Sequence, residues 1–308
     1  MRSPPRIYVG VTDLGWFDFL SARPGLDEVN FWRPGGSGAR LAPGTLFLFK
    51  LKSPRNVIGG GGIFVHAERM TVGTAWEFYG ERNGAQSANA LLALIARNRP
   101  TPIGLDHPIG CDILSTPFFL EADEWLSLPA DWPRSGIQQG KYYDLGTVAG
   151  DYLWQQILAR TAARNPAFSA GPGIFGGHGT PLMVVPRLGQ GTFRKLVLAA
   201  YDNRCALTGE KTIPVLQASH IKPFAETHGH EIQNGISLRS DIHTLFDRGY
   251  VTITPDHRFR VSTKLREDFS NGRVYYEHDG RTIQLPSEPQ LRPRPEFLEW
   301  HADEVFKG

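Results

Sequence analysis

The stretch YDNRCALTGEKTIPVLQASHIKPFAETHGHEIQNGISLRSDIHTLFDRGYVTI, residues 201–253, decides the fold of the second half of the chain. A short apolar run at 215–218 predicts a strand, and Pro223 prevents its continuation as a helix. Residues 235–238 alternate between apolar and polar side chains, as a second, half-buried strand does. We therefore expect two short strands joined by a polar loop.

A helix is expected directly after the second strand. Ser240 suits the N-cap position, residues 241–247 carry apolar side chains at helical spacing, and Gly249 is a typical helix end. His243 and Asp247 are four residues apart, so they share one face of this helix. His243 can thus point back toward the two strands.

Three polar residues occupy defined places in this strand, loop, strand, helix pattern. His220 lies at the end of the first strand, Asn234 precedes the second strand, and His243 is on the helix. In residue types, order and spacing, the stretch resembles the HNH endonuclease family, whose ββα-metal fold is named after a His, Asn, His order. The segment CALTG at 205–209 also looks like the opening segment of that family.

The resemblance implies a role for each of the three residues. His220 would be the general base, because a neutral imidazole with a pKa of about 6.5 can take a proton from water at cellular pH. His243 would bind one divalent cation, Mg²⁺ or Mn²⁺, which neutralises charge on the phosphoryl oxygens. Asn234 would keep the ring of His220 oriented.

The chain departs from the family pattern at one position. Many members place an aspartate directly before the base histidine as a metal ligand, and this chain has Ser219 there. The metal candidates are therefore His243 and Ser219. Of these, Ser219 is the weaker, because a serine hydroxyl is a weak and neutral ligand. Asp241 is expected to be no more than an indirect support. With only Cys111 and Cys205, the chain cannot form a four-cysteine zinc site.

Charge is unevenly distributed along the chain. Residues 187–266 contain 12 Lys and Arg against 7 Asp and Glu, whereas residues 267–308 contain 5 against 9. A local positive field favours binding to the phosphates of double-stranded DNA. The acidic tail is expected to pack on the basic domain. The candidate DNA-binding residues are Arg187, Arg194, Lys195, Lys222 and Arg239.

The first part of the chain, residues 1–145, reads as strands around a few helices, separated by Gly and Pro. Its motifs are VNFW at 29–32, PGTLFLFK at 43–50 and a glycine run at 59–62, for which we expect a bulge or a close backbone approach. In this order they resemble the PUA superfamily, which includes EVE, ASCH and SRA-type readers. The resemblance implies a small β-barrel-like domain that holds a flipped, modified base. The candidate pocket residues are Trp16, Phe31, Trp32 and Asp112.

The expected fold class is therefore α+β, with a reader domain at 1–145 and an HNH nuclease domain at 187–266. Between them, residues 146–186 are expected to form a helical segment and linker, and residues 267–308 a mostly extended tail. Within the reader domain we expect helices at 74–79 and 88–97. Two separate strands are expected at 109–114 and 117–120.

Composition excludes some classes of protein. The chain of 308 residues is 41% hydrophobic, as expected for a globular protein with two cores. The start of the chain lacks a long apolar segment, so we expect the protein to be neither exported nor inserted into a membrane. Two cysteines that are distant in sequence favour a reducing compartment. The cytoplasm is the expected location.

The sequence thus predicts a restriction endonuclease that cuts DNA carrying a modified base such as modified cytosine. A single catalytic centre per chain favours action as a homodimer. Two alternatives stay open. The first is a DNA-binding protein whose nuclease has decayed, which Ser219 permits. The second is an HNH nuclease of mobile elements or repair without specificity for modified bases.

Overall fold

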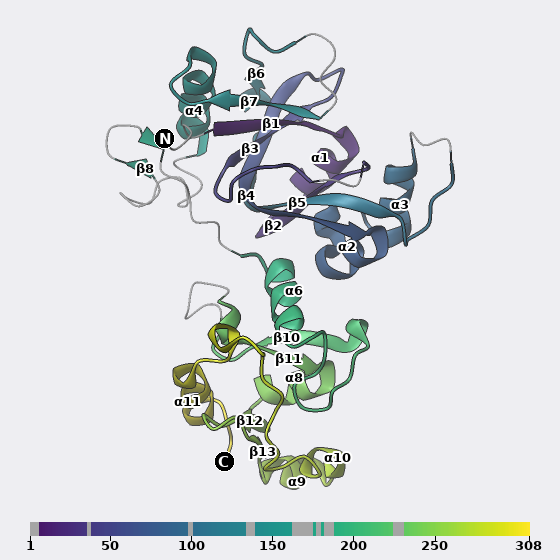
Figure 1. Ribbon diagram of the computed structural model, residues 1–308, viewed down its shortest axis with the longest axis vertical. Coiled ribbons are helices and arrows are strands. Elements are labelled where there is room, and N and C mark those ends of the chain that lie inside the picture. Colours follow the sequence, from purple (N-terminus) through teal and green to yellow (C-terminus); the bar gives the residue numbers. More distant parts are fainter. Residues whose placement is uncertain are drawn as a thin grey trace. The chain divides into compact units, whose positions relative to one another are not determined.

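The structure is a computed structural model that describes residues 6–35, 38–97, 101–133, 139–161, 175–176, 180–181, 188–223 and 231–308. The chain divides into two compact units, Met1–Arg187 and Leu188–Gly308 (Figure 1). Within the described residues, every helix is too short or too polar to cross a membrane. Both cysteines, Cys111 and Cys205, are buried free thiols.

Seven strands of the first unit form one sheet in the order β2-β5-β4-β3-β1-β7, with β6 beside β4. Strands β1 and β3 are parallel, and the other neighbours are antiparallel. Strands β2 and β7 lie at the two ends of this order and, in the described residues, do not pair with each other. The sheet is therefore open and differs from the small barrel that we expected. The strands are β1 (Arg6–Thr12), β2 (Glu28–Arg33), β3 (Leu46–Leu51), β4 (Val57–Thr71), β5 (Pro108–Phe119), β6 (Leu126–Ser127) and β7 (Gly140–Asp144).

The glycine run lies inside the long strand β4, where neighbouring strands approach closely. A Cβ atom at Gly60 would collide with the main-chain oxygen of Phe118, and one at Gly61 would lie 2.6 Å from the oxygen of Phe47. The pairing with β5 also shifts register between Gly61 and Ile63. The expected bulge and close approach are confirmed.

Strand β5 is one strand where the sequence predicted two. The chain passes from one predicted piece to the other through a local irregularity, with Thr116 at a positive φ of 47°. Pairing with β2 ends at Ser115, and β4 pairs with β5 on both sides of this point. Pairing with β4 thus keeps the parts of β5 before and after Thr116 in one strand.

Helices cover the sheet, and one of them was not expected. Helix α1 (Leu14–Ser21) begins at Asp13, whose carboxylate accepts hydrogen bonds from the backbone of Gly15 and Trp16. Trp16, Phe17 and Leu20 of this helix join an aromatic core with Phe31, Phe47, Phe49 and Phe64. The remaining helices of the unit are α2 (Val72–Tyr79), α3 (Ala88–Ala96) and α4 (Val148–Thr161), with 3-10 turns at η1 (Gly80–Asn83) and η2 (Ala122–Glu124), and a short pair β8 (Phe175–Gly176) and β9 (Thr180–Pro181).

Helix α4 belongs to the packing of the first unit. We expected it in a segment that connects two domains. Its residues Leu153, Trp154 and Ile157 instead lie in a core cluster with Ile7 and Val9 of β1. Burial of these three residues gives helix α4 an apolar face.

The second unit is built around the hairpin of β10 (Leu216–His220) and β11 (Gly235–Arg239), which runs directly into α8 (Ser240–Asp247). Arg239, not Ser240, takes the N-cap position, and its side chain makes no capping bond, because a guanidinium has no acceptor for the backbone N–H groups. Helix α6 (Gln190–Ala200) packs on the hairpin. Further elements are η3 (Ile213–Val215), η4 (Ile232–Asn234), β12 (Val251–Ile253), β13 (Phe259–Val261), α9 (Lys264–Phe269), α10 (Arg273–Tyr276), η5 (Pro289–Leu291) and α11 (Pro295–Glu304).

Candidate active site

His220 is the last residue of β10 and is held against helix α6. It pairs with Gly235 in the hairpin, and its ring stacks on that of Phe193 with centroids 4.1 Å apart and planes inclined by 11°. A side chain at Gly235 would collide with Val197 and Phe193. Glycine at this place therefore lets α6 approach the hairpin, which fixes the imidazole plane.

Asn234 fixes the main chain that follows His220. Its side chain is fully buried. The amide oxygen accepts a hydrogen bond from the backbone N–H of Lys222 at 2.9 Å, and the amide nitrogen donates to the Lys222 carbonyl at 2.8 Å. The main-chain oxygen of Asn234 accepts a third bond from Ile221. Three hydrogen bonds thus tie the segment after His220 to the start of β11.

His243 lies on α8 between two polar partners. Its Nδ1 is 2.6 Å from Oε1 of Gln217 on β10, and its Nε2 is 3.3 Å from Oδ2 of Asp247. The Asp247 side chain is 56% exposed, so this carboxylate can take up a further partner. Asp241, in contrast, forms two hydrogen bonds with the guanidinium of Arg239 and one with the hydroxyl of Tyr275.

His220 and His243 line a pocket of about 370 Å³ in the second unit, whereas Asn234 is not among its lining residues. The pocket is lined by His220 from β10, His243 and Asp247 from α8, and Trp300, His301 and Val305 from the C-terminal segment. The structure therefore brings together the two expected histidines. It adds Asp247, which the sequence pattern placed on the helix face of His243 but which we did not assign to the site.

Ser219 is placed differently from the other candidates. It is fully buried and is not among the residues that line the pocket. Its Oγ atom has no hydrogen-bond partner among the described residues. An orphaned hydroxyl in a buried place is uncommon, because a lost hydrogen bond there costs about 1–3 kcal/mol.

The candidate DNA-binding residues have different surroundings. Arg194 donates to the main-chain oxygens of Ile213 and Leu216, so it holds the start of β10. Burial lowers the pKa of Lys195. Lys222 lies with its Nζ 5.1 Å from the ring centroid of Trp300. Arg239 is paired with Asp241, and Arg187 lies outside the described residues.

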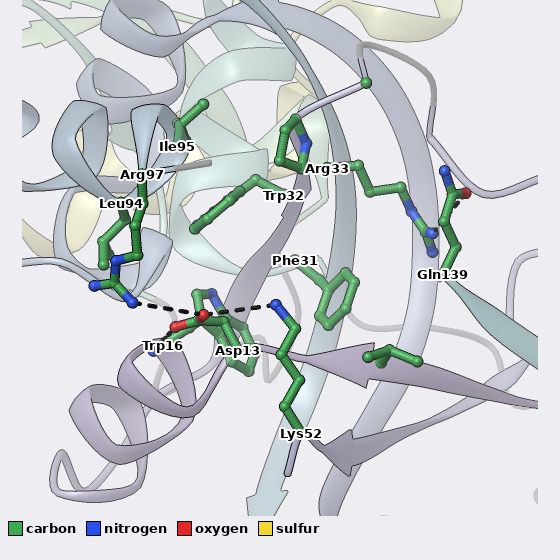
Figure 2. A pocket seen from close by; sticks show the side chains of 13 residues that line it. Asp13, Trp16, Phe31, Trp32, Arg33, Lys52, Leu94, Ile95, Arg97 and Gln139 are labelled. Atoms are coloured by element: carbon green, nitrogen blue, oxygen red, sulfur yellow. Dashed lines mark hydrogen bonds and ion pairs between the residues drawn. The ribbon is translucent and has the colours of Figure 1, made fainter. Parts of the chain in front are cut away.

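A second pocket, of about 360 Å³, lies in the first unit (Figure 2). Trp16, Phe31 and Trp32, the three aromatic candidates, all line it. Both indole N–H groups are satisfied inside the protein: Trp16 donates to the main-chain oxygen of Asn30 at 3.1 Å, and Trp32 to that of Asn83 at 3.0 Å. The rings are therefore held in fixed orientations.

Asp13 is an acidic residue that lines this second pocket. Its Oδ2 atom lies 3.7 Å from Nζ of Lys52 and 4.0 Å from a guanidinium nitrogen of Arg97, and Figure 2 shows the carboxylate between these two cations. Its other oxygen caps helix α1. A carboxylate fixed in this way, beside aromatic walls, can accept hydrogen bonds from a bound molecule.

Asp112, the fourth candidate of the reader domain, does not line this pocket. It is fully buried, accepts a hydrogen bond from the backbone of Ala39, and pairs with Arg33 at 2.6 Å. Burial raises the pKa of the Asp112 carboxyl, and the Arg33 guanidinium opposes this rise. Arg33 itself lines the pocket. The carboxylate thus holds Arg33 in place beside the pocket.

Comparison with known protein families finds a match within the second unit. Residues 205–254, which contain His220, Asn234, His243 and Asp247, match the model of a family described as HNH endonuclease. This segment of the chain is therefore similar to the HNH endonuclease family. No curated protein matches the chain.

Two solved structures show distant likenesses. One is the ASCH protein from Zymomonas mobilis, with 15% identity, a TM-score of 0.31, and coverage of 49% of this chain and 94% of that chain. The other is the modification-dependent TagI restriction endonuclease, with 14% identity, a TM-score of 0.30, and coverage of 92% of this chain and 77% of that chain.

Proposed function

We propose that the second unit hydrolyses phosphodiester bonds of DNA at the pocket formed by His220, His243 and Asp247. One observation carries this proposal: two histidines and a carboxylate from β10 and α8 line one pocket, within the segment that matches the HNH endonuclease family. A base and a metal-binding group on facing elements are what hydrolysis of a phosphodiester requires.

His220 is the general base of the proposed reaction. Its imidazole takes a proton from a water molecule, whose oxygen forms a bond to phosphorus as the bond from phosphorus to the departing oxygen breaks. The departing oxygen then takes up a proton from solvent. The stacking on Phe193 and the bonds of Asn234 to Lys222 hold the imidazole and the chain after it in place, so little reorganisation is needed on the way to the transition state.

The donor set on α8 suits a divalent cation. His243 and Asp247 supply an imidazole nitrogen and a carboxylate oxygen from the same helix face, and among the described residues no third His, Cys, Asp or Glu joins them. Mg²⁺ and Mn²⁺ are commonly held by few protein ligands, together with water and substrate phosphate. When bound, such an ion would stabilise the negative charge that grows on the phosphate. The buried Ser219 is not a suitable ligand for it.

The first unit is the proposed reader of a modified base. A nucleobase that is flipped out of the duplex needs flat apolar walls and a few polar groups that read its edge. The pocket offers Trp16, Phe31 and Trp32 as walls and Asp13 as an acceptor for an exocyclic amino group, such as that of cytosine. Lys52 and Arg97 lie next to Asp13 and suit the phosphate of the same nucleotide.

Cleavage of paired plasmids tests both parts of the proposal. One plasmid is unmodified and the other carries 5-methylcytosine or 5-hydroxymethylcytosine, and each is incubated with Mg²⁺ or Mn²⁺. We expect cleavage of the modified plasmid that is lost in His220→Ala and kept in His278→Ala, a control in the C-terminal tail. A double-strand product at rates that rise with the square of protein concentration would indicate that two copies act together.

Two other results of the plasmid experiment would each indicate a different function. Equal cleavage of both plasmids would leave the nuclease standing and remove the modified-base reader. DNA binding without cleavage under any metal would replace the nuclease with a binding protein whose catalytic site has decayed.

A further inference from the structure

The C-terminal helix α11 lies outside the segment that matches the HNH family, yet it forms one wall of the pocket around His220. Trp300, His301 and the following Val305 all line that pocket. Phosphodiester chemistry itself needs the base and the metal ligands, which β10 and α8 provide. The wall formed by α11 is therefore available for another task.

Helix α11 is rigidly attached beside the site. The ring of His301 stacks on Phe246 of α8 with centroids 3.6 Å apart, and its nitrogens lie 2.8 Å from Oγ1 of Thr252 and 3.1 Å from the main-chain oxygen of Phe246. Leu298 is fully buried. The position of the neighbouring Trp300 is thus fixed relative to α8.

A second contact fixes the chain after α11. Gly249 has a positive φ of 74°, and its main-chain oxygen accepts a hydrogen bond from Lys307 at 3.0 Å. A side chain at Gly249 would collide with the main-chain oxygen of Val305. Because glycine is required there for both reasons, the turn that ends α8 is shaped to receive the C-terminal segment.

Trp300 differs from the tryptophans that complete the cores. Trp154 of α4 is 5% exposed within a core cluster, whereas Trp300 is only partly buried and lines a pocket together with three histidines. The ammonium of Lys222 lies 5.1 Å from its ring centroid. An indole face in a concave site, with a cation beside it, matches the two halves of a nucleotide: a base that stacks and a phosphate that attracts the cation.

We propose that Trp300 stacks on a nucleobase next to the scissile phosphate, while Lys222 binds a phosphate of the same strand. The inference rests on the proposed nuclease function and adds a substrate-binding residue to it. Stacking on a single aromatic ring tolerates every base, so this contact positions the strand without selecting a sequence. Selection then remains a task of the first unit.

The test uses the full-length protein and a duplex whose cleavage position has been mapped. A second set of duplexes carries an abasic nucleotide at each position around that phosphate in turn. Wild type, Trp300→Ala, Trp300→Phe and Glu299→Ala are compared by kcat and KM. Glu299 is an exposed neighbour on the same helix and serves as the control. Thermal unfolding of each variant shows whether the fold is kept.

We expect Trp300→Ala to lose roughly 5- to 150-fold in kcat/KM on intact DNA, the range of one stacked base. Trp300→Phe should recover most of this loss, and Glu299→Ala should match wild type. At one abasic position, wild type should fall to the level of Trp300→Ala, and Trp300→Ala should lose nothing further.

Two results would overturn the inference while leaving the nuclease intact. One is full activity of Trp300→Ala on intact DNA. The other is an equal loss for Trp300→Ala on intact DNA and on every abasic duplex, which would mean that the ring supports only the fold. A wild-type protein that cuts no DNA would remove the proposed function and this inference with it.

Discussion

The side-chain amide of Asn234 forms two hydrogen bonds with the main chain of Lys222. Its oxygen accepts from the Lys222 N–H, and its nitrogen donates to the Lys222 carbonyl. This bridge crosses from the start of β11 to the segment directly after His220. The position of the proposed base therefore depends on a side chain that is buried and need not touch DNA.

Replacing Asn234 should separate positioning from binding. Asn234→Ala removes the partner of the partly buried N–H and carbonyl of Lys222, at a cost of about 0.5–1.5 kcal/mol for each hydrogen bond in the free energy of unfolding. We expect kcat to fall by at least tenfold while KM for DNA changes little. Urea unfolding and steady-state cleavage measure the two effects. Unchanged kcat in a destabilised variant would contradict the positioning role.

Asp247 and Asp241 form a matched pair of carboxylates on the same helix. Asp247 lines the pocket beside His243, whereas the pKa of Asp241 is held low by hydrogen bonds from Arg239. Asp247→Asn should raise the Mn²⁺ concentration needed for half-maximal cleavage by roughly 10- to 100-fold. Asp241→Asn should leave it near the wild-type value. Equal metal dependence in both variants would remove Asp247 from the metal site.

His301 should make the second unit less stable in acid. Burial lowers its pKa to about 4, whereas the unfolded chain binds a proton at about 6.5. The stability that the neutral ring provides is complete above pH 6.5 and declines as the pH falls toward 4, by roughly 3 kcal/mol in total. Urea unfolding between pH 4.5 and 7.5 gives the free energy of unfolding as a function of pH. This free energy should change less with pH in His301→Gln than in wild type. The same pH dependence in both proteins would rule out His301 as the source of the acid sensitivity.

Asp13 should determine which base the first unit prefers. A duplex with 5-hydroxymethylcytosine and one with 5-hydroxymethyluracil differ at the exocyclic group, an amino group against an oxygen, with the same substituent at the 5 position. We expect wild type to bind the cytosine form roughly tenfold or more tightly, because a hydrogen bond to a charged acceptor is worth about 1.5–3 kcal/mol.

Asp13→Asn isolates this effect, since asparagine caps helix α1 as well as aspartate does. In this variant the preference for the cytosine duplex over the uracil duplex should become smaller, as measured by fluorescence anisotropy. Thermal unfolding should show that the fold is kept. A wild-type protein that binds both duplexes equally would argue against Asp13 as the reader of an amino group.

Local patterns in the sequence predicted much of the second unit. The hairpin and α8 follow from alternation and helical spacing within 201–253, and both histidines of that pattern reach one pocket. Asp247 was visible as a residue on the face of His243, but spacing alone cannot tell which of two nearby carboxylates is already paired. Arg239 and Tyr275 decide that for Asp241.

Contacts between distant segments were beyond the reach of the sequence. Trp300 meets the pocket from a helix more than 50 residues after His243, and its neighbours along the chain carry no sign of this. No helix was expected at 14–21, although Asp13 is a typical N-cap for one. The open sheet likewise depends on which distant strands pair, and local alternation does not specify that.

The attachment of α11 has a consequence for the modular use of the proposed nuclease. A fragment limited to the family segment, 205–254, would lack both Phe193, on which the proposed base stacks, and the helix that carries Trp300. Engineers who fuse such a segment to a new targeting domain would transfer the residues of the motif without the walls of the pocket. The unit to transfer is therefore the compact unit Leu188–Gly308. A fusion at residue 308 would adjoin Lys307, whose backbone N–H donates a hydrogen bond to Gly249 at the end of α8.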